Sequence, residues 1–363
     1  MIDSLKIQGF RSFDEFSMTG FSNVNLLLGT NNAGKTSALE ALEILVERAN
    51  PSSVLRSCVR RGEFVFDEQS DRVPPPLDIR HLFHGHLVEE GNEFAISEKG
   101  ELKPPYVRVL PYSESIHGQL ISTGNGEFSP PDIILEVESD LIEDPITIGP
   151  STWRRDRRRG GPPYHREMRI HGDSISQFVA TFDSSLVELS SLWSDIALED
   201  DEQRVIEALN VIEPEISRIA FLPGFRRVET GFAGFFVRMR KSGGRIPIGS
   251  LGDGLKRLLT LSLHLVSAQN GVLLIDEIDT GLHHSVLQRM WHLILETSKK
   301  LNIQVFATTH SLDCVRSLAW LCEEQEAFAS DVCVHRLEKT RKKSIRYGAD
   351  ELIDAVAHDI EVR

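Results

Sequence analysis

Two glycines, a lysine and a threonine near the N-terminus have a spacing that suits phosphate chemistry. Gly29 and Gly34 enclose four residues, and Lys35 and Thr36 follow directly. Glycines here permit backbone angles and a close approach that let successive amides point at phosphate oxygens. Lys35 would reach the β- and γ-phosphates of a nucleotide, and the Thr36 hydroxyl would ligate magnesium. The residues expected to contact the nucleotide are Gly29, Asn31, Asn32, Ala33, Gly34, Lys35, Thr36 and Ser37.

The segments on both sides of this loop support the prediction. The apolar run before Gly29 is typical of a buried strand, and Lys35 to about Ala49 carries alanine, leucine and glutamate at helical spacing. A loop between strand and helix also places an anion at the positive end of the helix dipole. A chance glycine turn is the alternative, and the two flanking elements argue against it.

Two adjacent carboxylates follow a second apolar run. Val272–Ile275 is typical of a buried parallel strand, whose carboxyl end is where functional residues lie in such sheets. Asp276 would hold magnesium through water, and Glu277 would polarise the attacking water. Alternatively, the two acids are only favourable charges at the start of a helix. The phosphate loop upstream favours the catalytic interpretation.

A similar arrangement follows one helix later, after the helix expected from Ser285 to about Lys300. The apolar strand Gln304–Thr308 leads into polar residues, among which His310 would donate to the γ-phosphate. A lone histidine after a strand is usually structural. Its place one helix after the acidic strand favours a functional role.

A glycine-rich turn at 248–254 leads into a helix expected to run to about Val266. Small residues at a helix N-terminus form a second anion cradle. One chain needs one cradle for one nucleotide, so the second suggests that two copies clamp each nucleotide between them. An ordinary glycine turn that caps a core helix is the alternative. The residues expected to reach a partner's nucleotide are Ser250, Gly252, Asp253 and Gly254.

Several elements are needed to position these motifs. Residues 1–20 alternate as an antiparallel hairpin would, and residues 51–173 alternate proline clusters with short runs, of which 106–109 and 133–137 are expected as antiparallel strands. Two helices are expected between 174 and 219, the first with Phe178, Phe182, Leu186, Leu189 and Leu192 on one face. Further strands are expected at 219–222, 234–239 and 245–248.

The composition limits where the chain works. The net charge of −14 argues against a surface made for gripping a nucleic-acid backbone. The four cysteines show no zinc-type spacing, which fits a reducing cytoplasm. No basic and apolar leader and no apolar run of roughly 20 residues is found, so we expect a cytoplasmic protein without a membrane segment.

In order, these motifs resemble those of the ABC-type P-loop ATPases of the RecF/SMC/OLD group, including the opening Leu5–Phe13. The likeness is closest to stand-alone OLD-like AAA-family ATPases without a TOPRIM domain, which occur beside nuclease genes in bacterial defence islands. It covers about residues 1–50 and 185–320. The resemblance implies ATP hydrolysis with Mg²⁺, a nucleotide contact from Arg11, and trans contacts from Ser250 to Gly254.

Two positions depart from the family pattern. The usual Leu-Ser-x-Gly signature is Leu-Gly-Asp-Gly at 251–254, so Ser250 is the candidate substitute for the missing serine, as a helix cap. Asp253 would repel a phosphate unless it faces the partner's backbone. His283 stands where transporters of this type carry aspartate, and no glutamine switch is evident between residues 50 and 185.

The resulting fold prediction is α/β, a P-loop NTPase of ABC/SMC-like type whose mixed sheet is flanked by helices and carries an antiparallel-β-rich insertion. We expect residues 1–50 to form the N-terminal half of the ATPase domain. Residues 51–184 would be a partner-facing insertion. Residues 185–363 would form the C-terminal half.

The leading functional hypothesis is a dimer that hydrolyses ATP and acts as a sensor or regulator of a separate effector, preferably a nuclease, in anti-phage defence. The alternative is a RecF/SMC-like DNA-repair or DNA-binding ATPase. A nuclease within the chain is disfavoured because only 53 residues follow His310. A transporter subunit is disfavoured by the long insertion.

Two further patterns are open to more than one interpretation. The basic run Arg154–Arg159 would contact a nucleic-acid backbone, or is a solvated charge run or an anchor for an acidic partner. The histidines of 81–86 have ligand-like spacing, but no cysteine or acid completes a set, so ordinary surface or core histidines are favoured.

Overall fold

The computed structural model describes residues 1–64, 77–86, 88–89, 91–99, 105–111, 133–138, 146–148, 176–181, 185–223, 234–241, 244–358 and 360. The basic run Arg154–Arg159 lies outside the described residues.

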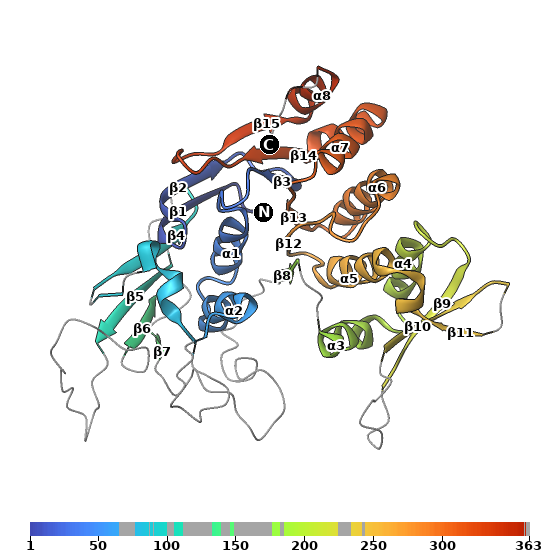
Figure 1. Cartoon of the computed structure of the whole chain (residues 1–363), viewed down its shortest axis with the longest axis horizontal. Helices are drawn as coiled ribbons and strands as arrows, with labels where there is room; N and C mark the ends of the chain where they lie inside the picture. The colour runs from blue at the N-terminus through green and yellow to red at the C-terminus, as the bar shows by residue number, and fades with distance from the viewer. Residues whose placement is uncertain are drawn as a thin grey trace.

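A six-stranded sheet runs through the centre of the molecule (Figure 1). Its strands pair in parallel except for the edge strand β15, which is antiparallel to β14. Every residue of the three central strands is buried, because helices cover both faces of the sheet. In spatial order the strands are β15 (Ile345–Gly348), β14 (Val332–Arg336), β3 (Val24–Leu28), β13 (Gln304–Thr308), β12 (Val272–Ile275) and β8 (Ser176–Val179).

The two faces of this sheet belong to different cores. Leu26 and Leu28 point into a core formed with α5, α6 and α7, whereas Leu27 points into a core formed with α1 and α2. This alternation follows from the two-residue period of a strand. Figure 1 shows α1 and α2 on one side of the sheet and α5, α6 and α7 on the other.

A second six-stranded sheet is entirely antiparallel and confirms the predicted hairpin and the two strands expected in the middle of the chain. Strand β4 pairs with β1, with Lys6 opposite Ser97, so that strands from the middle segment extend the N-terminal hairpin. The spatial order is β2 (Phe13–Thr19), β1 (Ser4–Phe10), β4 (Glu93–Ser97), β5 (Tyr106–Pro111), β6 (Ile133–Glu138) and β7 (Ile146–Ile148).

A small three-stranded sheet and two helices form a lobe beside α5 (Figure 1). Its strands are β11 (Arg245–Pro247), β10 (Gly234–Met239) and β9 (Ile216–Leu222), close to the predicted ranges. The helices are α1 (Lys35–Val46), α2 (Pro51–Arg61), α3 (Leu186–Ile196), α4 (Asp200–Leu209), α5 (Asp253–Ser267), α6 (His284–Lys300), α7 (Leu312–Glu324) and α8 (Ala349–Ala357). None of these described helices is long and apolar enough to span a bilayer.

One secondary-structure prediction was wrong. Phe178 was expected on a helix, but it lies on β8, in register with Leu274 of β12, and Phe182 lies outside the described residues. A short apolar run has too few residues for its period to separate strand from helix. Strand β8 therefore belongs to the central sheet, although the expected insertion was 51–184.

Two buried histidines make the stability of this fold depend on pH. His264 of α5 and His335 of β14 are almost fully buried. Burial, with Arg257 near one and Arg346 near the other, lowers the pKa of each from 6.5 to about 4. Between these values only the unfolded chain binds the proton, so stability is lost as the pH falls.

We expect the free energy of unfolding to fall by about 2 kcal/mol per histidine between pH 7 and pH 5. Urea titrations at several pH values measure this, and the His264→Gln and His335→Gln variants should each show a shallower decline. His292→Gln removes an exposed histidine and should keep the wild-type decline. An unchanged decline in the double variant of the buried pair would contradict the assignment.

Candidate functional site

The parallel strands bring the predicted residues to one edge of the central sheet. The phosphate loop follows β3, and Asp276 comes directly after β12. His310 comes after β13 with one residue, Thr309, in between. Because these strands are parallel and adjacent, their carboxyl ends meet. The three motifs therefore follow neighbouring strands of the sheet.

The glycines of the phosphate loop are required by the protein's own packing. Gly29 has φ of +148°, and a Cβ there would lie 2.5 Å from the carbonyl oxygen of Leu337. Gly34 has φ of +93°, and a Cβ would lie 2.5 Å from Cζ of Phe13. Any side chain at either place would displace neighbouring atoms, so the loop keeps its shape only with glycine.

Lys35 is positioned for an anion but now bonds to the loop. Its Nζ donates to the carbonyl oxygens of Gly29, at 2.8 Å, and Thr30, at 3.2 Å. Burial lowers the pKa of this ammonium, and the charges of Glu277 and Asp276 oppose that shift. Within the described chain no side chain caps the N-terminus of α1, so its first amides remain available to a phosphate.

Asp276 joins four elements of the fold. Its carboxylate accepts hydrogen bonds from Thr36 of α1 at 3.1 Å, from Thr308 of β13 at 2.7 Å and from Thr181 after β8 at 3.0 Å. Oxygen-only donors are the set that Mg²⁺ prefers. The residues present therefore fit a magnesium ion held by Thr36 and Asp276.

Glu277 and His310 lie side by side at the mouth of the site. Nδ1 of His310 is 3.2 Å from Oε1 of Glu277, and the two side chains are 53% and 30% exposed. Glu277 has φ of +46°, a left-handed conformation that is uncommon for this residue type. Its N–H donates to Oγ1 of Thr308 at 2.8 Å. The carboxylate is thus fixed by its backbone and open to a water or a phosphate.

Arg257 connects the glycine-turn helix to this edge. It lies one turn into α5 and is 7% exposed. Its guanidinium donates at 2.9 Å to the carbonyl oxygens of Ala180, Asp276 and Glu277. A rigid planar fork is needed to reach several carbonyls at once. The contact holds the strained peptide of Glu277 and ties it to the helix that follows the glycine turn.

Sequence reasoning missed three residues of this site: Thr181, Thr308 and Arg257. Thr181 follows β8, for which the sequence pattern predicts a helix. The same part of the chain, residues 50–185, shows no glutamine switch that would draw attention to it. Arg257 could have been noticed as a charge inside an apolar helix, since Leu255, Leu258 and Leu259 surround it. Thr308 had no signal beyond its place in the Thr-Thr-His run.

The glycine turn is open to solvent. Ser250, Gly252 and Asp253 are exposed, and Gly252 has φ of +101°. The Asp253 side chain is 86% exposed and pairs with Lys256 at 2.9 Å. Gly254 packs against the loop after the acid pair, because a Cβ there would lie 3.2 Å from the carbonyl oxygen of Gly281. The turn is therefore free to meet a neighbouring molecule, as the trans contact requires.

Arg11 lies among carboxylates of its own chain. Its guanidinium is buried and lies 2.6 Å from Oε2 of Glu40, and it also bonds Glu63 at 2.8 Å and Ser57 at 3.0 Å. These carboxylates pair with the charge of Arg11, and its contact with a nucleotide stays a prediction. Arg11 anchors α1, because Glu40 lies on that helix and is also held by Arg61.

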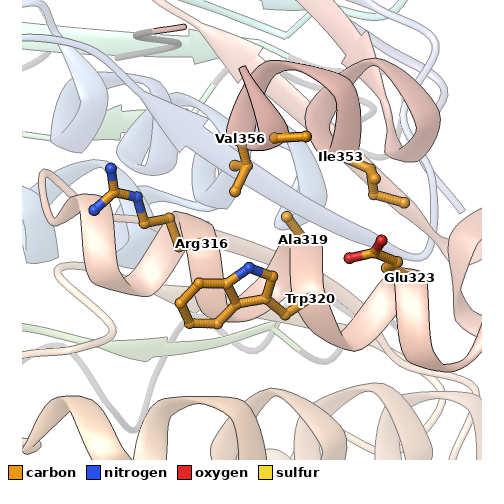
Figure 2. A pocket seen from close by; sticks show the side chains of 7 residues that line it. Arg316, Ala319, Trp320, Glu323, Ile353 and Val356 are labelled. Atoms are coloured by element: carbon orange, nitrogen blue, oxygen red, sulfur yellow. The ribbon is translucent and has the colours of Figure 1, made fainter. Parts of the chain in front are cut away.

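A separate pocket lies between α7 and α8, with a volume of about 320 Å³. Figure 2 shows Arg316 and Glu323 on either side of Trp320, whose side chain is 49% exposed, with Ile353 and Val356 opposite. None of these residues belongs to the set gathered around Asp276.

Comparison with known proteins bears on the same motifs. A protein from Helicobacter pylori named "ATP/GTP phosphatase" is 21% identical over 351 residues, which is 90% of either chain. An uncharacterized protein from Methanocaldococcus jannaschii is 37% identical over 65 residues, 18% of this chain and 57% of that protein.

Among solved structures, an Smc head bound to the C-winged helix domain of ScpA is similar, with 13% identity and a TM-score of 0.48 over 97% of this chain and 99% of that one. The SMC head domain from Thermotoga maritima has 14% identity and a TM-score of 0.43 over 96% of this chain and 99% of that one.

The family described as "AAA domain, putative AbiEii toxin, Type IV TA system" matches residues 24–313, from the strand before the phosphate loop to just beyond His310. This is well over half of the chain and includes every motif at the sheet edge. The chain therefore belongs to this AAA-domain family and is a P-loop ATPase.

Proposed function

We propose that two copies of this chain face each other head to tail and hydrolyse ATP, with Mg²⁺, at the two seams between them. The observation that carries the proposal is the glycine turn at 248–254. It is exposed, while the helix that it starts is bound through Arg257 to the backbone of Asp276 and Glu277. A nucleotide held by a neighbour's phosphate loop would then contact the N-terminus of α5, the same helix that positions Asp276 and Glu277 through Arg257.

Each residue at the sheet edge has a task in this reaction. Lys35 would exchange the carbonyls of Gly29 and Thr30 for the β- and γ-phosphate oxygens. When bound, Mg²⁺ supplies charge neutralisation at the phosphates, held by Thr36 and Asp276. Glu277 would orient the attacking water, because its carboxylate is exposed and fixed.

The role of His310 depends on which of its ring nitrogens carry a proton. Its Nδ1 faces Glu277, so in this arrangement the γ-phosphate would lie on the Nε2 side of the ring. To donate there, the imidazole must carry a proton on both nitrogens or turn away from Glu277. In the first case the imidazole stays paired with Glu277, and in the second the two side chains separate.

The finer biological role is proposed on narrower grounds. The relative named ATP/GTP phosphatase supports hydrolysis, and the toxin in the family's description supports a role in bacterial defence. The likeness of the motifs to those of OLD-like ATPases supports an effector, a nuclease, that responds to the nucleotide state. In this scheme closure of the dimer shifts a two-state equilibrium, and hydrolysis resets it.

Glu277→Gln should keep ATP binding but slow hydrolysis by about 100-fold or more, because the amide cannot accept the proton of the attacking water. The variant should accumulate as an ATP-bound dimer, which light scattering after gel filtration measures alongside phosphate release. Glu296→Gln, an exposed change on α6, is the matched control. Wild-type turnover in the Glu277 variant would reject its catalytic role.

A mixing experiment tests whether each site is shared between two copies. Lys35→Ala disables the phosphate loop and Asp253→Arg disables the exposed turn, so each variant alone should be inactive. In a mixed dimer one seam combines the intact phosphate loop of the Asp253 variant with the intact turn of the Lys35 variant. In an equal mixture about half of the dimers are mixed and each has one working site of two, so about a quarter of the wild-type rate should return. No recovery, with both variants folded and the Asp253 variant still binding ATP, would show that the turn does not act in trans.

Arg257→Gln should lower kcat by about tenfold while the Kd for ATP changes little, because the arginine holds the Glu277 peptide and does not reach the phosphate loop. Stopped-flow phosphate release and nucleotide titration separate the two effects. Arg257→Lys keeps the charge but not the fork and should also lose activity. Arg238→Gln on the exposed side of β10 is the control. Equal losses in Kd and kcat would point to general misfolding.

A further inference from the structure

Two histidines away from the ATP site face each other across a short turn. His81 lies on a 3₁₀ turn (Ile79–Leu82) and His86 ends the next one (His84–His86). Their Nδ1 atoms are 3.3 Å apart. The sequence pattern favours ordinary histidines here because no acid within it completes a set, but in the structure Asp78 lies behind the first ring.

A tight turn in the backbone brings the two rings together. Gly85 and His86 both have positive φ, +78° and +61°. Glycine adopts this region freely, and histidine is among the few other residue types that enter it more often than most. The N–H of His86 donates to the carbonyl oxygen of Phe83 at 3.2 Å, which closes the turn and directs the second ring back to the first.

The distance between the two nitrogens fits a shared metal ion. A direct hydrogen bond between imidazoles needs one protonated and one bare nitrogen, and 3.3 Å is longer than the usual range of about 2.7 to 3.2 Å. Two imidazole nitrogens that each lie about 2.05 Å from a tetrahedral zinc are about 3.3 Å apart. The rings thus already have the separation that zinc requires.

Asp78 provides the support that a metal-bound histidine needs. Its Oδ2 lies 3.5 Å from Nε2 of His81, on the side of the ring away from His86. The carboxylate is 5% exposed and fixed by Arg80, whose Nε and terminal nitrogen lie 2.8 and 2.6 Å away. A carboxylate that faces Nε2 favours the proton on that nitrogen, which leaves the lone pair on Nδ1.

We propose that His81 and His86 bind one divalent transition metal through their Nδ1 atoms, with zinc as the best fit and water in the remaining positions. Imidazole is a ligand that suits zinc, nickel and copper. Within the described ranges no group of three or more histidine, cysteine or acidic residues could hold a metal, so this is a site with two protein ligands. Nδ1 of His84 instead lies 2.9 Å from the carbonyl oxygen of Arg11.

The site would brace the segment that holds Arg11. The backbone N–H of Arg11 donates to the carbonyl oxygen of Leu82 at 2.9 Å. The guanidinium of Arg11 donates to the carbonyl oxygen of His81 at 3.3 Å. Arg11 in turn pairs with Glu40 on the helix that follows the phosphate loop. Metal binding would therefore stabilise this contact, whether or not the proposed ATP-bound dimer forms.

Calorimetric titration of zinc chloride into the full chain, without nucleotide or magnesium, tests the proposal. We expect one zinc per chain and at least a tenfold loss of affinity in His81→Ala and in His86→Ala. The His283→Ala, His284→Ala double variant removes another adjacent pair, with ring centroids 4.0 Å apart, and should bind zinc as the wild type does. X-ray absorption at the zinc edge should show two imidazoles with oxygen ligands.

A second measurement keeps the test decisive if a variant folds poorly. Zinc should raise the melting temperature of the wild type but not of the His81→Ala, His86→Ala double variant, whose folding is checked by circular dichroism and ATP binding. Unchanged zinc affinity in a folded double variant, or no zinc binding by the wild type, would overturn the proposal.

Discussion

The carboxylate of Asp276 is the point on which the catalytic edge depends. It accepts hydrogen bonds from threonine hydroxyl groups on the helix after the phosphate loop, on the strand before His310 and on the segment after β8. These elements are far apart in the sequence, and only a parallel sheet can bring their ends to one carboxylate. The order of the strands, with β13 between β3 and β12, therefore fixes which side chains meet at the phosphates.

Much of this could be predicted from the sequence because the signals are local. The phosphate loop, the acid pair and His310 each follow an apolar strand, and the period of the flanking helices is clear. The contacts of Thr181 and Arg257 depend instead on tertiary pairing. β8 has only four residues, so its strand character comes from β12 beside it. For Arg11 the motif position predicts a ligand contact, whereas its burial among carboxylates, which depends on tertiary packing, could not be predicted.

The helix after the phosphate loop carries two buried glutamates, and their partners explain why it tolerates them. Glu40 is shared by Arg11 and Arg61, and Glu43 pairs with Arg56 and Arg60. A buried carboxylate is destabilising unless it is paired and hydrogen-bonded. Helix α2 provides three of these arginines, so the segment that begins the middle of the chain also completes the nucleotide half of the fold.

The continuous antiparallel sheet has a mechanical consequence. Strands β5, β6 and β7 are joined in series through β4 to β1, and β1 pairs with β2, which begins at Phe13. The ring of Phe13 occupies the space where a side chain on Gly34 would be. The hydrogen-bonded strands from β7 to β2 therefore end at a ring that packs on Gly34, the residue before the phosphate helix, so this sheet meets the phosphate loop at a place of its own, apart from the central sheet.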